Sequence, residues 1–151
     1  MSELQKKDPI GQVRARSPLL RSYAEQFRSQ RPFEGSQIGV SAPLTPHTGL
    51  FVKVLAAGGA DVLVTGESGS TNPAVVESLA ELSGVSTFVE PGMSASELEQ
   101  ARRDLLRRGP DLLADDGAQL LRTVHDEFPE VAASVRGACE QTTGGITRLE
   151  G

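Results

Sequence analysis

Residues 110–127 read PDLLADDGAQLLRTVHDE, and this stretch indicates the fold class of the chain. Its apolar run, Leu112 to Ala114, predicts a buried strand, and Gln119-Leu120-Leu121 begins a helical pattern. Asp115 and Asp116 come directly after the strand. Ligands of open parallel sheets bind outside the carboxyl ends of the strands, so both carboxylates are candidate site residues. The alternative is that each one only caps the next helix.

The same alternation of strand, loop and helix continues on both sides of this stretch. Two helix starts carry a cap residue before a proline, and a third carries a capping box of Ser94 with Glu97. We expect strands at Gln37–Ala42, Asp61–Thr65, Val85–Val89, Leu112–Ala114 and Ser134–Cys139. The sequence thus predicts an α/β fold, a three-layer Rossmann-like domain with a mainly parallel five-stranded sheet and an amino-terminal helix.

The chain of 151 residues has the length of one domain. Residues 1–16 are polar and without periodicity, which predicts a flexible arm before a domain at 17–151. From Ser17 an amphipathic helix is expected, with its apolar residues against the domain: Leu19, Leu20, Tyr23 and Phe27.

Charge and composition narrow the class of protein. The net charge of -5 argues against nucleic acid as a partner, because nucleic-acid binders present basic surfaces. We assign the arginines at 102, 103, 107 and 108 to a solvated helix face. The single cysteine, Cys139, suits a reducing compartment. No apolar run is long enough for a bilayer, so we expect a cytoplasmic protein without membrane contact.

Polar residues follow the carboxyl ends of the expected strands. Hydroxyls and carboxylates that converge there suit a ligand with several hydroxyl groups, such as a ribose, although some of them are expected to be helix caps. The residues are Thr45, His47, Ser70, Thr71, Asn72, Asp115, Asp116, Glu140, Gln141, Thr142 and Thr143.

Phosphate-binding glycine motifs do not occur, and no bound cofactor or metal is expected. A metal site assembled from His47, Asp115 and Asp116 is an alternative. Cys139 as a nucleophile with His47 as base is another. Against it, a lone cysteine at a strand end is usually a small buried hydrophobe.

Several segments together resemble the amino-terminal part of the adenosylhomocysteinase family, from Ser17 to the end of the chain. They are RPFEGSQIGV at 31–40, LTPHT at 44–48, GSTNP at 69–73, DLLADDGAQL at 111–120 and RGACEQTTGGITRL at 136–149. The resemblance implies a substrate-binding domain. The family splits S-adenosylhomocysteine into adenosine and homocysteine with tightly bound NAD, and the chain stops where the family's NAD-binding domain would begin.

The resemblance also shows where this sequence departs from the family pattern. Pro43 stands where the family has a catalytic-site histidine, and His47 replaces the acid that contacts the adenine amino group. Gln141 replaces the carboxylate that holds the ribose hydroxyls. Asp116, Thr45, Ser70, Thr71, Thr142 and Thr143 are retained.

We therefore expect a stand-alone domain that binds, and transforms without NAD, a small polar or nucleoside-derived molecule. His47 and Asp116 are the acid–base candidates, and the other carboxyl-end residues bind the ligand. One alternative is a non-catalytic subunit that docks on a partner protein. Another is a fragment of a longer enzyme, or a decayed remnant of one. By analogy with the family, we expect a homo-oligomer or a partner protein, joined through exposed apolar surface.

Overall fold

A computed structural model describes residues 8–150 and confirms the α/β Rossmann-like prediction. Its sheet is five-stranded and wholly parallel, in the order β3-β2-β1-β4-β5. The strands are β1 (Gln37–Ser41), β2 (Asp61–Thr65), β3 (Val85–Thr87), β4 (Leu112–Asp115) and β5 (Gly137–Glu140). β1 and β3 end slightly earlier than expected, and β5 begins later.

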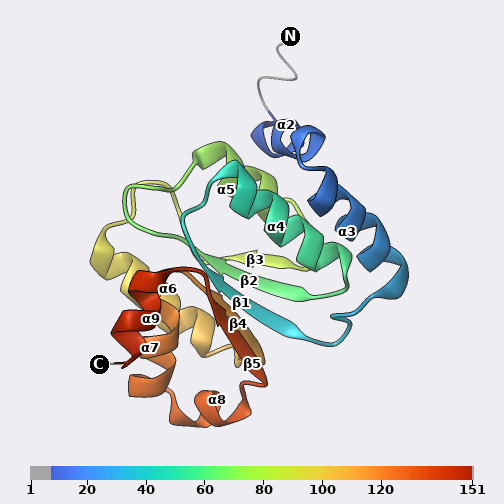
Figure 1. Cartoon of the computed structure of the whole chain (residues 1–151). Helices are drawn as coiled ribbons and strands as arrows, with labels where there is room; N and C mark the ends of the chain where they lie inside the picture. Colours follow the sequence, from blue (N-terminus) through green and yellow to red (C-terminus); the bar gives the residue numbers. More distant parts are fainter. Residues whose placement is uncertain (1–7, 151) are drawn as a thin grey trace.

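Helices cover both faces of the sheet (Figure 1). On one side lie α3 (Pro18–Gln30), α4 (Pro46–Ala57) and α5 (Pro73–Ala80). On the other lie α6 (Ala95–Leu106), α7 (Gln119–Glu127) and α8 (Pro129–Ser134). The buried apolar residues form two clusters, one around Val40, Leu50 and Val62 and the other around Leu63, Leu105 and Leu113. One cluster on each face of the sheet makes three layers.

The predicted helix starts are present with their caps. The Thr45 hydroxyl accepts from the Thr48 N–H at 3.3 Å, and the Asn72 side chain accepts from the N–H of Ala74. Ser94 and Glu97 form the complete capping box. None of the helices described over 8–150 is long and apolar enough to cross a membrane.

The amino-terminal segment differs from the expected flexible arm. Residues 9–16 form the helix α2 (Pro9–Arg16), which the Asp8 side chain caps through the Gly11 N–H. Ile10 is buried and packs on Gly49 of α4, where a β-carbon would lie 2.6 Å from the Ile10 side chain. Burial of that one apolar side chain orders a polar segment that lacks a periodic pattern. Residues 1–7 of the expected arm lie outside the described residues.

The apolar side chains of α3 do not all face the domain, which corrects the prediction. Leu19 is 67% exposed and Tyr23 is 42% exposed, whereas Leu20 and Phe27 are partly buried. Tyr23 contacts the Phe27 ring, whose other neighbour is Phe33. The apolar stripe of α3 is therefore wider than the part of the domain surface against which α3 packs.

The carboxyl-terminal segment also differs from the prediction of a strand at 134–139. Pro129 begins α8 instead, and β5 starts only at Gly137, opposite Leu112. A further helix, α9 (Thr143–Glu150), includes the glycine pair Gly144-Gly145. Gly145 is needed there because a β-carbon would lie 2.3 Å from the Glu140 carboxyl carbon.

Candidate functional site

The polar residues predicted at the carboxyl ends do come to one edge of the sheet. All strands are parallel, and the register places Ser41 beside both Thr65 and Asp115, with Glu140 beside Asp115. The loops that follow these strands therefore meet, as expected for an open parallel sheet.

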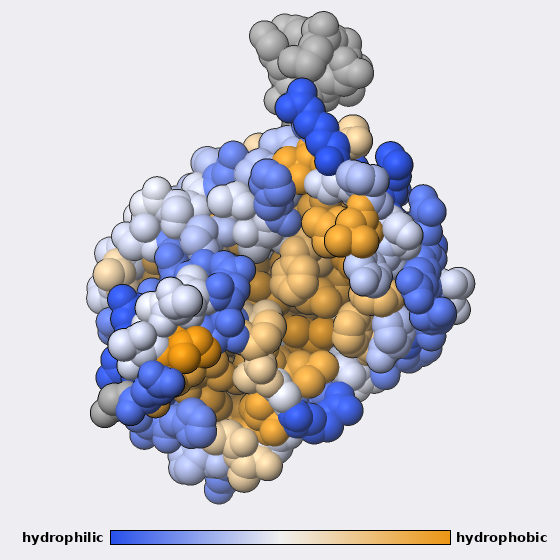
Figure 2. Space-filling model, viewed as in Figure 1, coloured by the Kyte–Doolittle hydropathy of each residue, from blue (hydrophilic) through white to orange (hydrophobic). Residues whose placement is uncertain are grey.

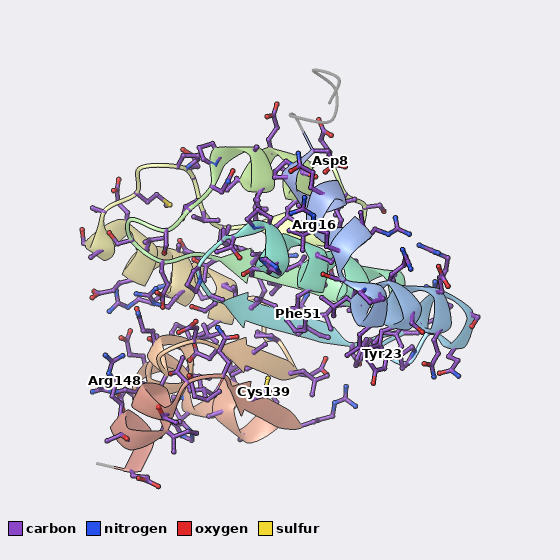
Figure 3. All side chains as sticks on the ribbon, turned by 45° about the horizontal axis from the view of Figure 1, so that its top comes forward. Asp8, Arg16, Tyr23, Phe51, Cys139 and Arg148 are labelled. Atoms are coloured by element: carbon purple, nitrogen blue, oxygen red, sulfur yellow. The ribbon has the colours of Figure 1, made fainter. Side chains whose placement is uncertain are left out.

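A crevice of about 300 Å³ opens beside this edge, between α4 and the uncovered faces of β4 and β5. Figure 2 shows an apolar hollow in this face, flanked by polar side chains, and Figure 3 labels Phe51 and Cys139, which both line it. Its walls are largely apolar, with polar groups at one end. The lining residues are Leu20, Val40, Ala42, His47, Thr48, Phe51, Ala114, Asp115, Cys139 and Gln141.

His47 and Gln141 are the polar residues of this crevice that remain available to a ligand. His47 occupies the first turn of α4 and is exposed. The Gln141 side-chain amide donates to the Asp116 carboxylate. Gln141 and His47 both line the crevice, whereas Asp116 is not among its lining residues, and no hydrogen bond links His47 to Asp116 within the described chain.

Asp115 has a different environment from its neighbour Asp116. It is 3% exposed, and its carboxylate accepts from the N–H groups of Leu121 at 2.8 Å and Asp116 at 3.0 Å. Burial raises the pKa of Asp115 to about 6, the Glu140 carboxylate adds to the rise, and the N–H donors oppose it. Its oxygens accept hydrogen bonds from main-chain N–H groups at the start of α7. Asp115 therefore caps the next helix, which is the alternative role that the sequence left open for it.

Glu140 is likewise committed to the fold. Its carboxylate accepts from the N–H groups of Gly117 at 2.9 Å and Ala118 at 2.8 Å, and from the hydroxyl and N–H of Thr142. Burial would raise the pKa of Glu140, but these hydrogen bonds outweigh it and hold the pKa below its ordinary value.

The structure accounts for most of the predicted hydroxyl and amide groups as local supports. Thr45 and Asn72 cap α4 and α5, and the Ser70 and Thr71 hydroxyls donate to the Glu67 carbonyl. The Thr142 hydroxyl accepts from Gly145 in the first turn of α9. Thr143 is exposed at the start of that helix.

Two further polar residues, Glu67 and Gln119, lie near this edge. Glu67 accepts from the Gln119 side chain at 3.2 Å. Burial raises the pKa of Glu67, and the Asp116 and Glu140 carboxylates contribute to the rise. The sequence indicates Glu67 by its position directly after the strand expected at 61–65, although it was not among the candidate ligand-binding residues. Gln119 looked only like a helix residue.

The prediction that Arg102 lies on a solvated helix face is wrong. The residue is 5% exposed and lies on the side of α6 that faces the neighbouring helices. The apolar pattern of α6 does not predict this, since Arg102 and Arg103 look equivalent in the sequence.

The structure bears differently on the two alternative sites, the metal site and the Cys139 nucleophile. No group of three His, Cys, Asp or Glu side chains within residues 8–150 could hold a metal ion. Cys139 is exposed, not buried, and lines the same crevice as His47. His125 is exposed on α7 and does not line that crevice.

The fold and crevice together define a Rossmann-like α/β domain that carries its candidate ligand site at the carboxyl edge of a parallel sheet. No protein-family model matches the chain. Individual relatives do match it, and they show that it is an adenosylhomocysteinase-like domain. About nine-tenths of the chain aligns with them, but it spans only about a third of their length.

Three relatives illustrate the match. The adenosylhomocysteinase of Archaeoglobus fulgidus is 38% identical over 132 residues, which is 87% of this chain and 32% of that protein. The S-inosyl-L-homocysteine hydrolase of Methanopyrus kandleri is 38% identical over 144 residues, 95% of this chain and 34% of that protein. The adenosylhomocysteinase of Aquifex aeolicus is 32% identical over 133 residues, with 87% and 32% covered.

Proposed function

We propose that this domain binds a purine nucleoside or its S-homocysteine derivative in the crevice between α4, β4 and β5. The observation that carries the proposal is the composition of the crevice. An apolar wall that includes Phe51 and Ala114 suits the flat face of a base, and His47 with Gln141 supplies hydrogen-bonding groups at its polar end. The names of the relatives indicate ligands of this class.

His47 fits more than one purine. A neutral imidazole has one donor and one acceptor nitrogen, so it can accept from an amino group or donate to a carbonyl. The relatives include hydrolases named for adenosyl and for inosyl substrates, whose bases differ in this way. Both purines therefore belong in the binding experiment.

We infer that the activity is acid–base chemistry without NAD, carried by His47 and by Asp116, the hydrogen-bond partner of Gln141. His47 reaches the crevice from α4, and the Asp116 carboxylate is held by Gln141, which lines the crevice. Asp116 is not itself a lining residue, and we infer that it reaches the ligand beside Gln141, where an imidazole and a carboxylate together can move a proton. The Asp115 and Glu140 carboxylates are excluded from this role because main-chain N–H groups occupy them.

A calorimetric titration of the purified chain without NAD tests the binding. The ligands are adenosine, inosine and the two S-nucleosylhomocysteines. We expect saturable one-to-one binding of at least one of them, and turnover that is lost in His47→Ala and Asp116→Ala while the fold is kept. If none of the ligands binds, the nucleoside pocket is wrong. If a ligand binds but turnover survives both substitutions, His47 and Asp116 have no part in the chemistry.

Exposed apolar side chains favour a second candidate function, docking on another protein. Leu19 and Tyr23 of α3 are exposed, and Leu20 and Phe51 line the crevice. In Figure 2 apolar surface extends across this face. A contiguous apolar surface of this kind is typical of an interaction site. Sedimentation analysis of the chain alone, and of Leu19→Ser with Tyr23→Ser, would show self-association and its loss. A monomer that co-purifies with no partner from its native host would contradict docking.

A further inference from the structure

A second pocket, of about 320 Å³, lies between α6, α7 and α9, away from the crevice lining. Its lining is mostly polar and rich in arginine. The residues are Glu99, Arg102, Arg103, Gly117, Ala118, Gln119, Arg122, Thr123, Asp126, Glu127 and Arg148. Figure 3 labels Arg148 on α9.

Arg102 is the unusual residue of this pocket. It is 5% exposed, yet its guanidinium forms no hydrogen bond or ion pair with any residue from 8 to 150. The nearest carboxylates act on it only at longer range, and burial lowers the pKa of Arg102. Its nitrogens are not among the buried side-chain atoms of residues 8–150 that lack a partner, so the guanidinium opens into the pocket. A largely buried cation without a direct protein partner favours a bound anion.

The neighbouring arginines leave further donors in the pocket. Arg148 donates one Nη1 hydrogen bond to the Gly117 carbonyl at 2.8 Å, which fixes its side chain against the start of α7. Arg122 is exposed, and its guanidinium has no partner among the described residues. Arg103 is already used, because it forms a two-point ion pair with Glu127 at 2.7 and 3.0 Å.

The acidic side chains of the pocket do not pair with the Arg102 guanidinium. Glu127 is neutralised by Arg103, and Glu99 and Asp126 are exposed and can point to solvent. The N–H groups of Gly117 and Ala118 at the start of α7 are taken by Glu140. The available donors are therefore guanidinium groups and not a free helix terminus.

We propose that this pocket binds an oxyanion group, a phosphate or a carboxylate, between the guanidinium groups of Arg102 and Arg148. A guanidinium presents a planar pair of N–H donors that matches two oxygens of either group. An oxyanion would give the Arg102 guanidinium the direct ion pair that no carboxylate of residues 8–150 makes with it. This pocket is separate from the nucleoside crevice, so either proposal can fail alone.

Titration of the whole chain with inorganic phosphate tests this site, with sodium chloride at equal ionic strength as the salt control and acetate as the carboxylate probe. We expect phosphate to bind saturably and to raise the melting temperature. Arg102→Met, which keeps the apolar stem, should weaken binding at least tenfold, and Arg148→Gln should also weaken it. Acetate binding as tightly as phosphate would identify a carboxylate ligand, whereas a preference for phosphate would identify a phosphate group.

Arg108→Gln is the matched control, because Arg108 is an exposed arginine beyond the end of α6 that does not line the pocket. This variant should bind phosphate like the wild type. If Arg102→Met does not fold, Arg148→Gln decides the test. An effect of phosphate no larger than that of chloride would overturn the proposal, and so would equal losses in the Arg148 and Arg108 variants.

Discussion

Glu140, the last residue of β5, accepts a 2.8 Å hydrogen bond from the N–H of Ala118, which precedes α7. The same carboxylate accepts from Gly117 and from Thr142. One acid thereby ties β5 to the loop after β4 and to the start of α9. Ala118 has a positive φ of 59°, a conformation that costs energy for a residue with a β-carbon, and this hydrogen bond helps to hold it.

We expect Glu140→Gln to lower the free energy of unfolding by about 2 kcal/mol at neutral pH, because the amide NH2 replaces one acceptor oxygen and leaves at least one part-buried main-chain N–H without a partner. The lowered pKa of Glu140 means that its ionised form stabilises the fold. That stability is present above the ordinary carboxyl pKa of about 4.3 and is lost as the pH falls through the lower value in the folded protein. Urea unfolding at several pH values measures it.

Glu77→Gln is the control, because Glu77 is an exposed glutamate on α5. Its stability should stay close to that of the wild type at every pH. A Glu140→Gln protein as stable as this control at neutral pH would show that the carboxylate is not a support of the fold.

The contribution of Asp115 to stability should change with pH in the opposite direction to that of Glu140. Its pKa is raised from 3.8 to about 6, so the protonated form is the one that the folded state favours. The stability it contributes is complete below the unfolded pKa and is lost as the pH rises through about 6. The wild type should therefore gain roughly 2 kcal/mol relative to Asp115→Asn as the pH falls from about 6 to about 4.

Asp126→Asn serves as the reference for this measurement, since Asp126 is an exposed aspartate of α7. The difference between wild type and Asp126→Asn should change little over the same range. Stability curves of wild type and Asp115→Asn that run parallel would mean that burial does not perturb Asp115.

Repeating local patterns made the sheet and most helix starts predictable from the sequence. Thr45 before Pro46, and Asn72 before Pro73, are short-range cap patterns that survive in the structure. The errors arose where a long-range contact decided the outcome. Ile10 orders α2 through its contact with Gly49, which lies 39 positions further along the chain.

The candidate site was predictable to the extent that strand ends determine it. Sequence placed His47, Gln141 and Asp116 at one edge, but it could not separate acids that are free from acids that accept main-chain hydrogen bonds. Asp115 and Asp116 are adjacent, and only the direction of each side chain distinguishes them. The burial of Arg102 beside exposed arginines depends on packing in the same way.

His47→Ala should weaken binding of a nucleoside ligand about tenfold, which corresponds to about 1.4 kcal/mol, roughly one lost hydrogen bond to the base. Calorimetry against the best ligand of the wild type measures the loss. His125→Ala is the matched control, because His125 is exposed on α7 and does not line the crevice. Equal affinities of the two variants would place the ligand elsewhere.

Thr65 and Ser41 lie side by side at the ends of β2 and β1, and both are fully buried. Neither hydroxyl has a hydrogen-bond partner among residues 8–150. An unpaired buried hydroxyl destabilises a fold, and valine has almost the shape of threonine. We expect Thr65→Val to raise the free energy of unfolding by about 1 kcal/mol, and Ser41→Ala to change it in the same direction.

Thr71→Val is the contrast, because the Thr71 hydroxyl donates to the Glu67 carbonyl at 3.2 Å. This variant should lose about 1 kcal/mol in the same urea unfolding experiment. A loss of stability in Thr65→Val as large as that in Thr71→Val would contradict the prediction. It would mean that the Thr65 hydroxyl has a partner from outside the chain, such as a buried water molecule held between β1 and β2.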